Sequence, residues 1–239
     1  KKGKKLSPLD PAPLKTIAAS NDNRQWQWLV HAIKVKGKNV LVVMDYHTRF
    51  SITLSGLKKG DDSTFMNSLE HHLAVHVHEM MTSINADSKA IEMSLERYRH
   101  KHNSCAFYMR GERSVQAHIN DVVWHFNRLA DNSGEVPIEV NLISFDVFMN
   151  EFLRKRKSEK DYFTPHYEFL HKWLRSFGEY SAAKAGACID SLKAMKLTDV
   201  TARHPILNSS SGHTDKPCLQ GKKGTSSSNV ITLDDYRKK

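Results

Sequence analysis

Residues 104–131, SCAFYMRGERSVQAHINDVVWHFNRLAD, contain the local pattern around which the rest of the chain can be placed. The apolar and aromatic run 105–109 predicts a short buried strand. The polar segment 110–113 contains one glycine and predicts a turn. Ser114 stands where an N-cap is expected, because its hydroxyl can accept a hydrogen bond from the first helical turn. Apolar residues then recur at helical spacing, at Val115, Ile119, Val122, Val123 and Phe126. The stretch therefore predicts a strand, a tight turn and an amphipathic helix.

Three polar residues of this predicted helix are candidates for a functional site. Arg113 and Asn120 are seven positions apart and lie roughly along one line of a helix, and Asp121 is next to Asn120. Two interpretations stay open at this point. The side chains are either solvated or bonded to backbone, or they form a small polar cluster at the mouth of a groove.

The predicted elements on either side of this stretch indicate an α+β fold. An antiparallel β-meander is expected upstream, with strands at residues 26–35, 40–44 and 50–54. Long amphipathic helices are expected at 63–82 and 87–101. Downstream, Ile138, Val140 and Leu142 alternate with polar residues, which predicts a further half-buried strand. Helices are then expected from Ser144 to the basic run at 154–157, from Pro165 to Phe177, and at 181–197.

Length and charge divide the chain into a core and two tails. The chain has 239 residues and a net charge of +10, which is carried mainly by its ends. Residues 1–20 carry +4, residues 21–177 carry +2 and residues 178–239 carry +4. We expect a basic, Pro-containing arm at 1–20, one core domain at 21–177 and a largely disordered basic tail at 178–239. Basic tails favour nucleic acid or other anionic surfaces.

The cysteines and the apolar runs indicate a cytoplasmic setting. Cys105, Cys188 and Cys218 show no paired spacing, which argues against a disulfide framework and a zinc knuckle and favours a reducing compartment. No apolar run is long enough for a membrane helix, and no signal-peptide pattern is present at the start. We therefore expect a cytoplasmic protein with no membrane partner.

Two local clusters are candidates for ligand binding. His72, His76 and Glu79 have the spacing of one helical stripe. They either bind a divalent metal, or the histidines are neutral or lie at the surface. We predict no cofactor beyond that alternative. The second cluster is basic and could contact nucleic acid or form a solvated helix end. Its members are Arg154, Lys155, Arg156, Lys157 and Lys160.

Two groups of residues carry a resemblance to a known family. The first comprises Trp28, Val40, Leu41, Asp45, Thr48, Phe50, Ser51 and the run 56–59, and the second Phe107, Arg113, Ser114, Val115, Asn120 and Asp121. Over about residues 26–130 the chain resembles an uncharacterised bacterial family, a domain of unknown function. The resemblance implies one α+β unit and a bacterial or mobile-element origin, and it supplies no activity. It directs attention to the polar matches Asp45, Thr48, Ser51, Arg113, Ser114, Asn120 and Asp121, whereas the histidines at 71–78 lie outside the family pattern.

These observations lead to one leading function and two alternatives. The motifs of P-loop, dinucleotide-binding and nucleophile-elbow proteins are absent from the sequence. We expect a non-catalytic binding or regulatory module whose partner is nucleic acid or protein. The first alternative is a hydrolase or nuclease for a phosphate-containing substrate, with a site at Asp45, Arg113, Asn120 and Asp121. The second is a structural subunit with an exposed apolar patch on the helix at 165–177.

Overall fold

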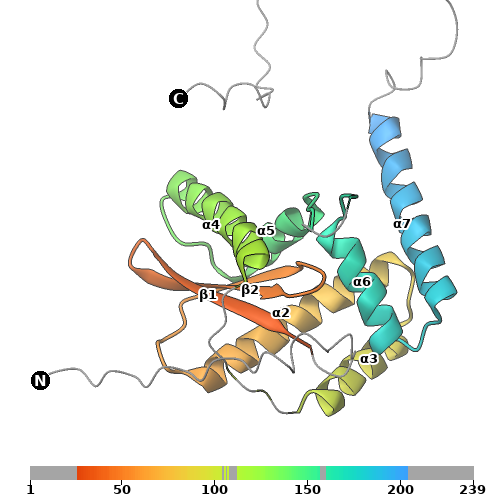
Figure 1. Cartoon of the computed structure of the whole chain (residues 1–239), viewed down its shortest axis with the longest axis horizontal. Coiled ribbons are helices and arrows are strands. Elements are labelled where there is room, and N and C mark those ends of the chain that lie inside the picture. The colour runs from red at the N-terminus through yellow and green to blue at the C-terminus, as the bar shows by residue number, and fades with distance from the viewer. Residues whose placement is uncertain (1–25, 104, 106, 108–111, 157–159, 204–239) are drawn as a thin grey trace, which may run out of the picture. The chain divides into compact units, whose positions relative to one another are not determined.

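The computed structural model describes residues 26–103, 105, 107, 112–156 and 160–203, and Figure 1 shows the arrangement of their helices and strands. The chain separates into two units, Lys1–Leu197 and Thr198–Lys239, and the fold described below belongs to the first. The predicted arm at 1–20 and most of the predicted C-terminal tail lie outside the described residues.

The sheet has three antiparallel strands whose order follows the sequence: β1 (Trp28–Val35), β2 (Lys38–Asp45) and β3 (Ser51–Ser55). Val35 pairs with Lys38, so Lys36 and Gly37 form a two-residue hairpin turn with φ values of 46° and 80°. Positive φ at both positions suits the right-handed twist of the strands, and glycine adopts it without steric cost. The predicted β-meander is confirmed.

The middle strand β2 is buried on both faces because its side chains alternate between two hydrophobic cores. Val43 belongs to the first core, whereas Val40, Val42 and Met44 belong to the second. Figure 1 shows helices on both sides of the sheet, with α4 and α5 on one side and α2 and α3 on the other. The predicted α+β class, an antiparallel sheet covered by helices, is confirmed.

Four helices pack on the sheet to form the first core, and each lies close to a position predicted from the sequence. They are α2 (Asp62–Ser83), α3 (Ser88–Lys101), α6 (Pro165–Ser176) and α7 (Ala182–Arg203). Aspartates cap α2 and α3, since Asp61 accepts a hydrogen bond from Thr64 N–H and Asp87 from Ala90 N–H. Ala185, Ile189 and Leu192 of α7 are buried in this core. The predicted core boundary at residue 177 is therefore too early, because a helix assigned to the tail packs on the domain.

The second core lies beneath α4 (Arg113–Ser133) and α5 (Glu139–Glu151). Val115, Ile119, Val122 and Phe126 of α4 are buried there, as their spacing predicts. Val123 is partly buried at the edge of the same core.

The helix α5 also closes the outer edge of the sheet. The backbone N–H of Ser51 donates to Asn150 Oδ1 at 2.8 Å, and the N–H of Thr53 donates to Asp146 Oδ2 at 2.9 Å. Asn150 in turn donates to the Ser51 carbonyl at 2.8 Å. An open edge strand exposes unpaired backbone groups that invite pairing with other chains. Here two α5 side chains, buried with no exposed surface, satisfy those groups.

The predicted strand at 138–142 is wrong, because Glu139 begins α5 and Ile138 is its N-cap. Of the three alternating apolar residues only Leu142 is buried, while Ile138 is 66% and Val140 70% exposed. The buried apolar residues of this segment are Leu142, Phe145 and Met149, which are three and four positions apart, as on one face of a helix. A short alternating run is compatible with either structure until its burial is known.

Two further predictions around the start of α4 are also wrong. The N-cap of α4 is Glu112, and Ser114 lies within its first turn. Of the strand predicted at 105–109, the two described residues, Cys105 and Phe107, lie outside any strand and are exposed. The centroid of the Phe107 ring lies 6.2 Å from that of Phe65 on α2, and Phe107 remains 44% exposed.

Candidate anion-binding pocket

The turn between β2 and β3 is built around the carboxylate of Asp45. Its Oδ2 atom accepts hydrogen bonds from the Thr48 N–H and the Thr48 hydroxyl, both at 2.7 Å, and from the His47 N–H at 3.2 Å. Such side-chain bonds to the backbone just ahead define an Asx turn. Arg49 follows with a left-handed φ of 61°, and its side chain reaches the start of α4. The turn therefore determines where Arg49 points.

The other oxygen of Asp45 binds a lysine from α6. Lys172 Nζ lies 3.0 Å from Asp45 Oδ1, with the carboxylate fully buried and the lysine side chain 18% exposed. The ammonium also lies 3.9 Å from the centroid of the Trp26 ring, a cation–π contact. Burial lowers the pKa of Lys172, and the charge of Asp45 opposes that shift. This ion pair connects the sheet to α6 and brings a second cation to the turn.

Arg49 is buried without an ion-pair partner among the described residues, although the charges of Asp45 and Glu112 act on its guanidinium. Its side chain is only 4% exposed, and its one hydrogen bond runs from Nη2 to Ser114 Oγ at 3.2 Å. The Nε and Nη1 atoms are buried and have no hydrogen-bond partner in the described part of the chain. Burial and the nearby charge of Arg156 lower the pKa of Arg49. A buried cation with unused donors is costly, so the site favours an anionic ligand.

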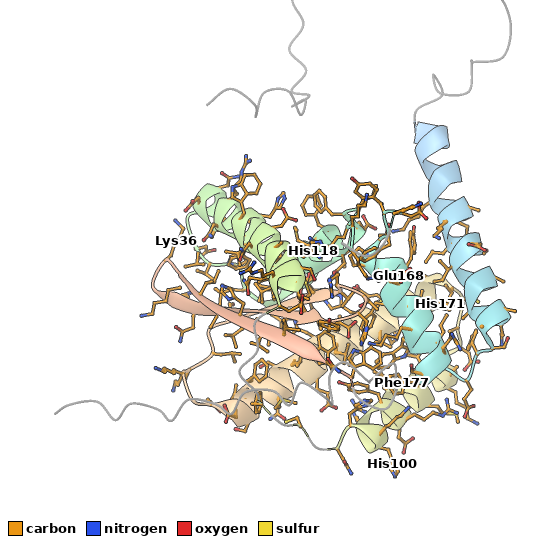
Figure 2. The ribbon with its side chains drawn as sticks, viewed as in Figure 1. Lys36, His100, His118, Glu168, His171 and Phe177 are labelled. Carbon is orange, nitrogen blue, oxygen red and sulfur yellow. The ribbon has the colours of Figure 1, made fainter. Side chains whose placement is uncertain are left out.

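A pocket of about 650 Å³ opens between this turn, the start of α4 and α6. Glu168 and His171, labelled on α6 in Figure 2, belong to its wall. The start of α4 also borders the pocket, and there the Glu112 carboxylate accepts a hydrogen bond from Ser114 Oγ at 3.3 Å. The residues that line the pocket are Tyr46, His47, Thr48, Arg49, Glu112, Ser114, Arg156, Glu168, His171 and Lys172.

Other cations of the pocket are paired with carboxylates. Arg156 Nη2 lies 3.3 Å from Glu168 Oε2, and Arg156 Nε donates to the His47 carbonyl at 3.0 Å. Burial, reinforced by the charge of Lys172, lowers the pKa of His47, so its imidazole is neutral at pH 7. Arg49 therefore supplies the positive charge that has no carboxylate partner in the described part of the pocket. This arrangement suits a phosphate group.

The structure does not bring the four predicted polar candidates together. Asp45 borders the pocket through Lys172, but the other three residues are not among those lining it. Arg113 and Asn120 are exposed on α4. Asp121 instead binds Arg154, with 3.1 Å between Asp121 Oδ2 and Arg154 Nη1.

The predicted basic cluster follows α5 rather than ending it, and its members have different environments. Arg154 is 4% exposed and forms a β-bridge with Phe163, and its Nε and Nη2 atoms have no hydrogen-bond partner in the described part of the chain. Arg156 lines the pocket. Lys155 and Lys160 are exposed, and Lys157 lies outside the described residues.

The predicted histidine stripe is divided between the core and the surface. His72 and His76 are buried on α2, whereas Glu79 is exposed. His76 Nε2 lies 3.5 Å from Asp146 Oδ2 on α5. In the described ranges no group of three His, Cys, Asp or Glu side chains is placed to hold a metal ion. The side chains of His72, His76 and Glu79 are thus not placed together as three ligands.

Sequence reasoning missed Arg49 and Lys172, the two cations that the turn and its ion pair place at the pocket. Only Arg49 carries a weak signal in the sequence, because it directly follows Thr48 and lies close to Asp45, and both of these residues match the family pattern. Lys172 is 127 positions away from Asp45 along the chain, and no local pattern joins them. Asp45 and Thr48 were indicated correctly as polar positions, although their role in the turn was not.

The fold and the pocket define a class of protein: an α+β domain in which a strand-connecting turn holds a buried arginine at a polar pocket. Among known families, the model described as "Domain of unknown function (DUF6933)" matches residues 1–168. The chain belongs to this family, which confirms the resemblance seen over residues 26–130 and extends it in both directions. No curated protein and no solved structure matches the chain. No helix in the described ranges is long and apolar enough to cross a membrane.

Proposed function

We propose that this protein is a non-catalytic binding module for nucleic acid and that its pocket holds a backbone phosphate. The observation that carries the proposal is the buried Arg49 guanidinium, whose Nε and Nη1 donors have no partner in the described part of the chain. Arginine donors bind phosphate oxygens through charge-assisted hydrogen bonds. Phosphate contacts of this kind position a protein on nucleic acid without reading its sequence.

The charge distribution supports a nucleic-acid partner over a protein partner. The net charge is +10, and residues 1–20 and 178–239 carry +4 each. Such segments attract a polyanion through long-range electrostatics and counterion release. A bacterial or mobile-element origin and a cytoplasmic setting belong to this proposal, on the grounds of the family resemblance and the unpaired cysteine spacing.

The two alternative functions have less support. A hydrolase or nuclease at the four predicted polar residues would need carboxylates available for substrate. Asp45 already accepts four hydrogen bonds, and Asp121 is paired with Arg154. A structural subunit was expected to expose an apolar patch on α6. The large apolar residues of α6, among them Phe169 and Trp173, are instead buried in the first core.

A salt titration of nucleic-acid binding tests the proposal. Fluorescence anisotropy with labelled DNA and RNA would compare the full chain with Arg49→Met and with the control Arg99→Met. Arg99 is a surface arginine on α3 that pairs with Glu70. We expect Arg49→Met to weaken binding about thirtyfold and to reduce the slope of log K against log salt by about one. The control should bind like the wild type.

Two results would contradict the proposed function. One is the absence of binding to any nucleic acid at about 50 mM salt, where phosphate contacts are strong. The other is equal affinity and equal salt dependence for the wild type and Arg49→Met, which would place binding outside the pocket.

A further inference from the structure

A surface of aromatic rings lies on α4 and α5, outside the pocket. This aromatic surface consists of Trp124, His125, Phe148 and Phe152, of which Trp124 is 49%, Phe148 53% and Phe152 36% exposed. His125 lies between the others, with its ring centroid 4.7 Å from Trp124 and 5.2 Å from Phe152. Phe148 and Phe152 are 4.8 Å apart. Four neighbouring rings that remain accessible to solvent indicate an interaction surface.

A groove beside these rings offers room for a planar ligand. Its volume is about 430 Å³, and His125, Phe145 and Phe148 form part of its lining. Burial lowers the pKa of His125, so its ring is uncharged at pH 7. The polar side chain of Asn141 lies at the same groove. Ser133, Glu135 and Ser144 also line the groove. Aromatic faces together with amide and hydroxyl groups are the chemistry that holds an unpaired base.

Basic side chains connect the aromatic surface to the pocket. Arg128 Cζ stands 4.9 Å from the centroid of the Trp124 ring. Phe152 is followed by the buried Arg154, by the exposed Lys155 and by Arg156, which lines the pocket. The four residue steps from Phe152 to Arg156 span at most about 14 Å. A phosphate in the pocket and a base on the aromatic surface are therefore within the reach of one strand.

On the basis of the function proposed above, we propose that the nucleic acid is single-stranded and that its bases stack on Trp124, Phe148 and Phe152. In a duplex the base faces are stacked on one another and are inaccessible to protein rings. Unpaired bases stack on aromatic side chains while cationic side chains follow the phosphates, which is how single-strand-binding proteins work without reading sequence. A second copy of the chain would bury the same rings, and the sedimentation measurement below tests that alternative.

Binding of the full chain to a labelled single strand and to the corresponding duplex tests the inference, with the two affinities compared at equal salt and the slope taken from a salt series. We expect the single strand to bind at least tenfold more tightly. Trp124→Ala should weaken single-strand binding about tenfold, whereas Trp124→Phe should keep most of the affinity. Unlike Arg49→Met, Trp124→Ala should leave the salt slope unchanged, because stacking displaces no counterions. Met93 is an exposed apolar residue on α3, so Met93→Ala is the control and should have no effect.

Separate outcomes decide the inference and the underlying function. Equal affinity for single strand and duplex, or wild-type binding by both Trp124→Ala and Phe148→Ala, would overturn the stacking inference while nucleic-acid binding stands. A lack of binding to either nucleic acid would overturn both. Sedimentation that shows a dimer of the wild type, abolished by Trp124→Ala, would instead assign the aromatic surface to self-association. Circular dichroism melting checks that each variant is folded.

Discussion

Replacing Asp45 by asparagine should destabilise the protein, because this carboxylate holds both the β2–β3 turn and Lys172. Its two oxygens accept four hydrogen bonds, three from His47 and Thr48 and one from Lys172. An asparagine amide can keep one oxygen toward Thr48, but its NH₂ group then faces the Lys172 ammonium. The change therefore removes the ion pair and leaves a largely buried cation without its partner.

The structure allows the size of this effect to be worked out. Removing one partner of a buried ion pair costs about 3–5 kcal/mol. The Lys172 side chain retains 18% exposure, and burial already lowers its pKa, so it can partly rehydrate or lose its proton. We therefore expect Asp45→Asn to cost about 3 kcal/mol at pH 7, near the lower limit. For a domain of this size that corresponds to a fall in Tm of roughly 6–12 °C.

A double-mutant cycle separates the ion pair from the turn. Lys172→Met leaves the fully buried Asp45 carboxylate without its cation but with its three turn hydrogen bonds, so it should also cost about 3 kcal/mol. Urea unfolding followed by tryptophan fluorescence would give the free energy of unfolding for both single variants and for the double variant. Because the two side chains interact directly, the double variant should lose at least about 1 kcal/mol less than the sum of the single losses.

Two outcomes of this cycle would refute the reasoning. Additivity within about 0.5 kcal/mol would mean that Asp45 and Lys172 do not interact in solution. A loss below about 1 kcal/mol for Asp45→Asn would mean that the ion pair with Lys172 contributes little to stability. A change in m-value would show that a variant alters the compactness of the unfolded or folded state.

Three further predictions concern stability. Arg49→Met removes a buried cation whose Nε and Nη1 donors have no partner in the described part of the chain. In the absence of nucleic acid it should therefore raise the free energy of unfolding by about 1 kcal/mol. A fall in the urea midpoint would contradict this. Asn150→Ala should cost about 2–3 kcal/mol because Ser51 loses partners for its backbone N–H and C=O, and amide exchange at Ser51 should accelerate. Burial lowers the pKa of His118 from 6.5 to about 4, so the unfolded chain binds more protons between these values and stability should fall as the pH drops through them. Urea midpoints from pH 7 to 4.5 should therefore decline less steeply in His118→Gln than in the wild type.

Local chemistry was sufficient to predict most of the elements. Alternation and turn residues indicated the three strands, and the Lys36–Gly37 turn follows from the φ freedom of glycine. Apolar spacing indicated α2, α3, α4 and α6 because each presents one face to a core. The segment at 138–142 failed for a physical reason. Its short alternation fits a strand and a helix equally, and only packing on the sheet decided that α5 begins at Glu139.

The candidate site could be predicted only in part, because its members are distant in sequence. Asp45 and Thr48 were indicated by their family match, and their contacts are local. The ion pair of Asp45 with Lys172 spans 127 positions, and the bond from Arg49 to Ser114 spans 65. No periodicity or propensity encodes such contacts.

The amino-acid sequence by itself determined the α+β class, the β-meander and the helical faces, since these depend on steric and hydrogen-bonding preferences of neighbouring residues. The tertiary structure alone decided that Asp146 and Asn150 close the edge of β3 and that Arg49 is buried. Burial sets the cost of an unpaired charge. A surface arginine and a ligand-binding arginine therefore look alike in sequence, and only the packed chain distinguishes them.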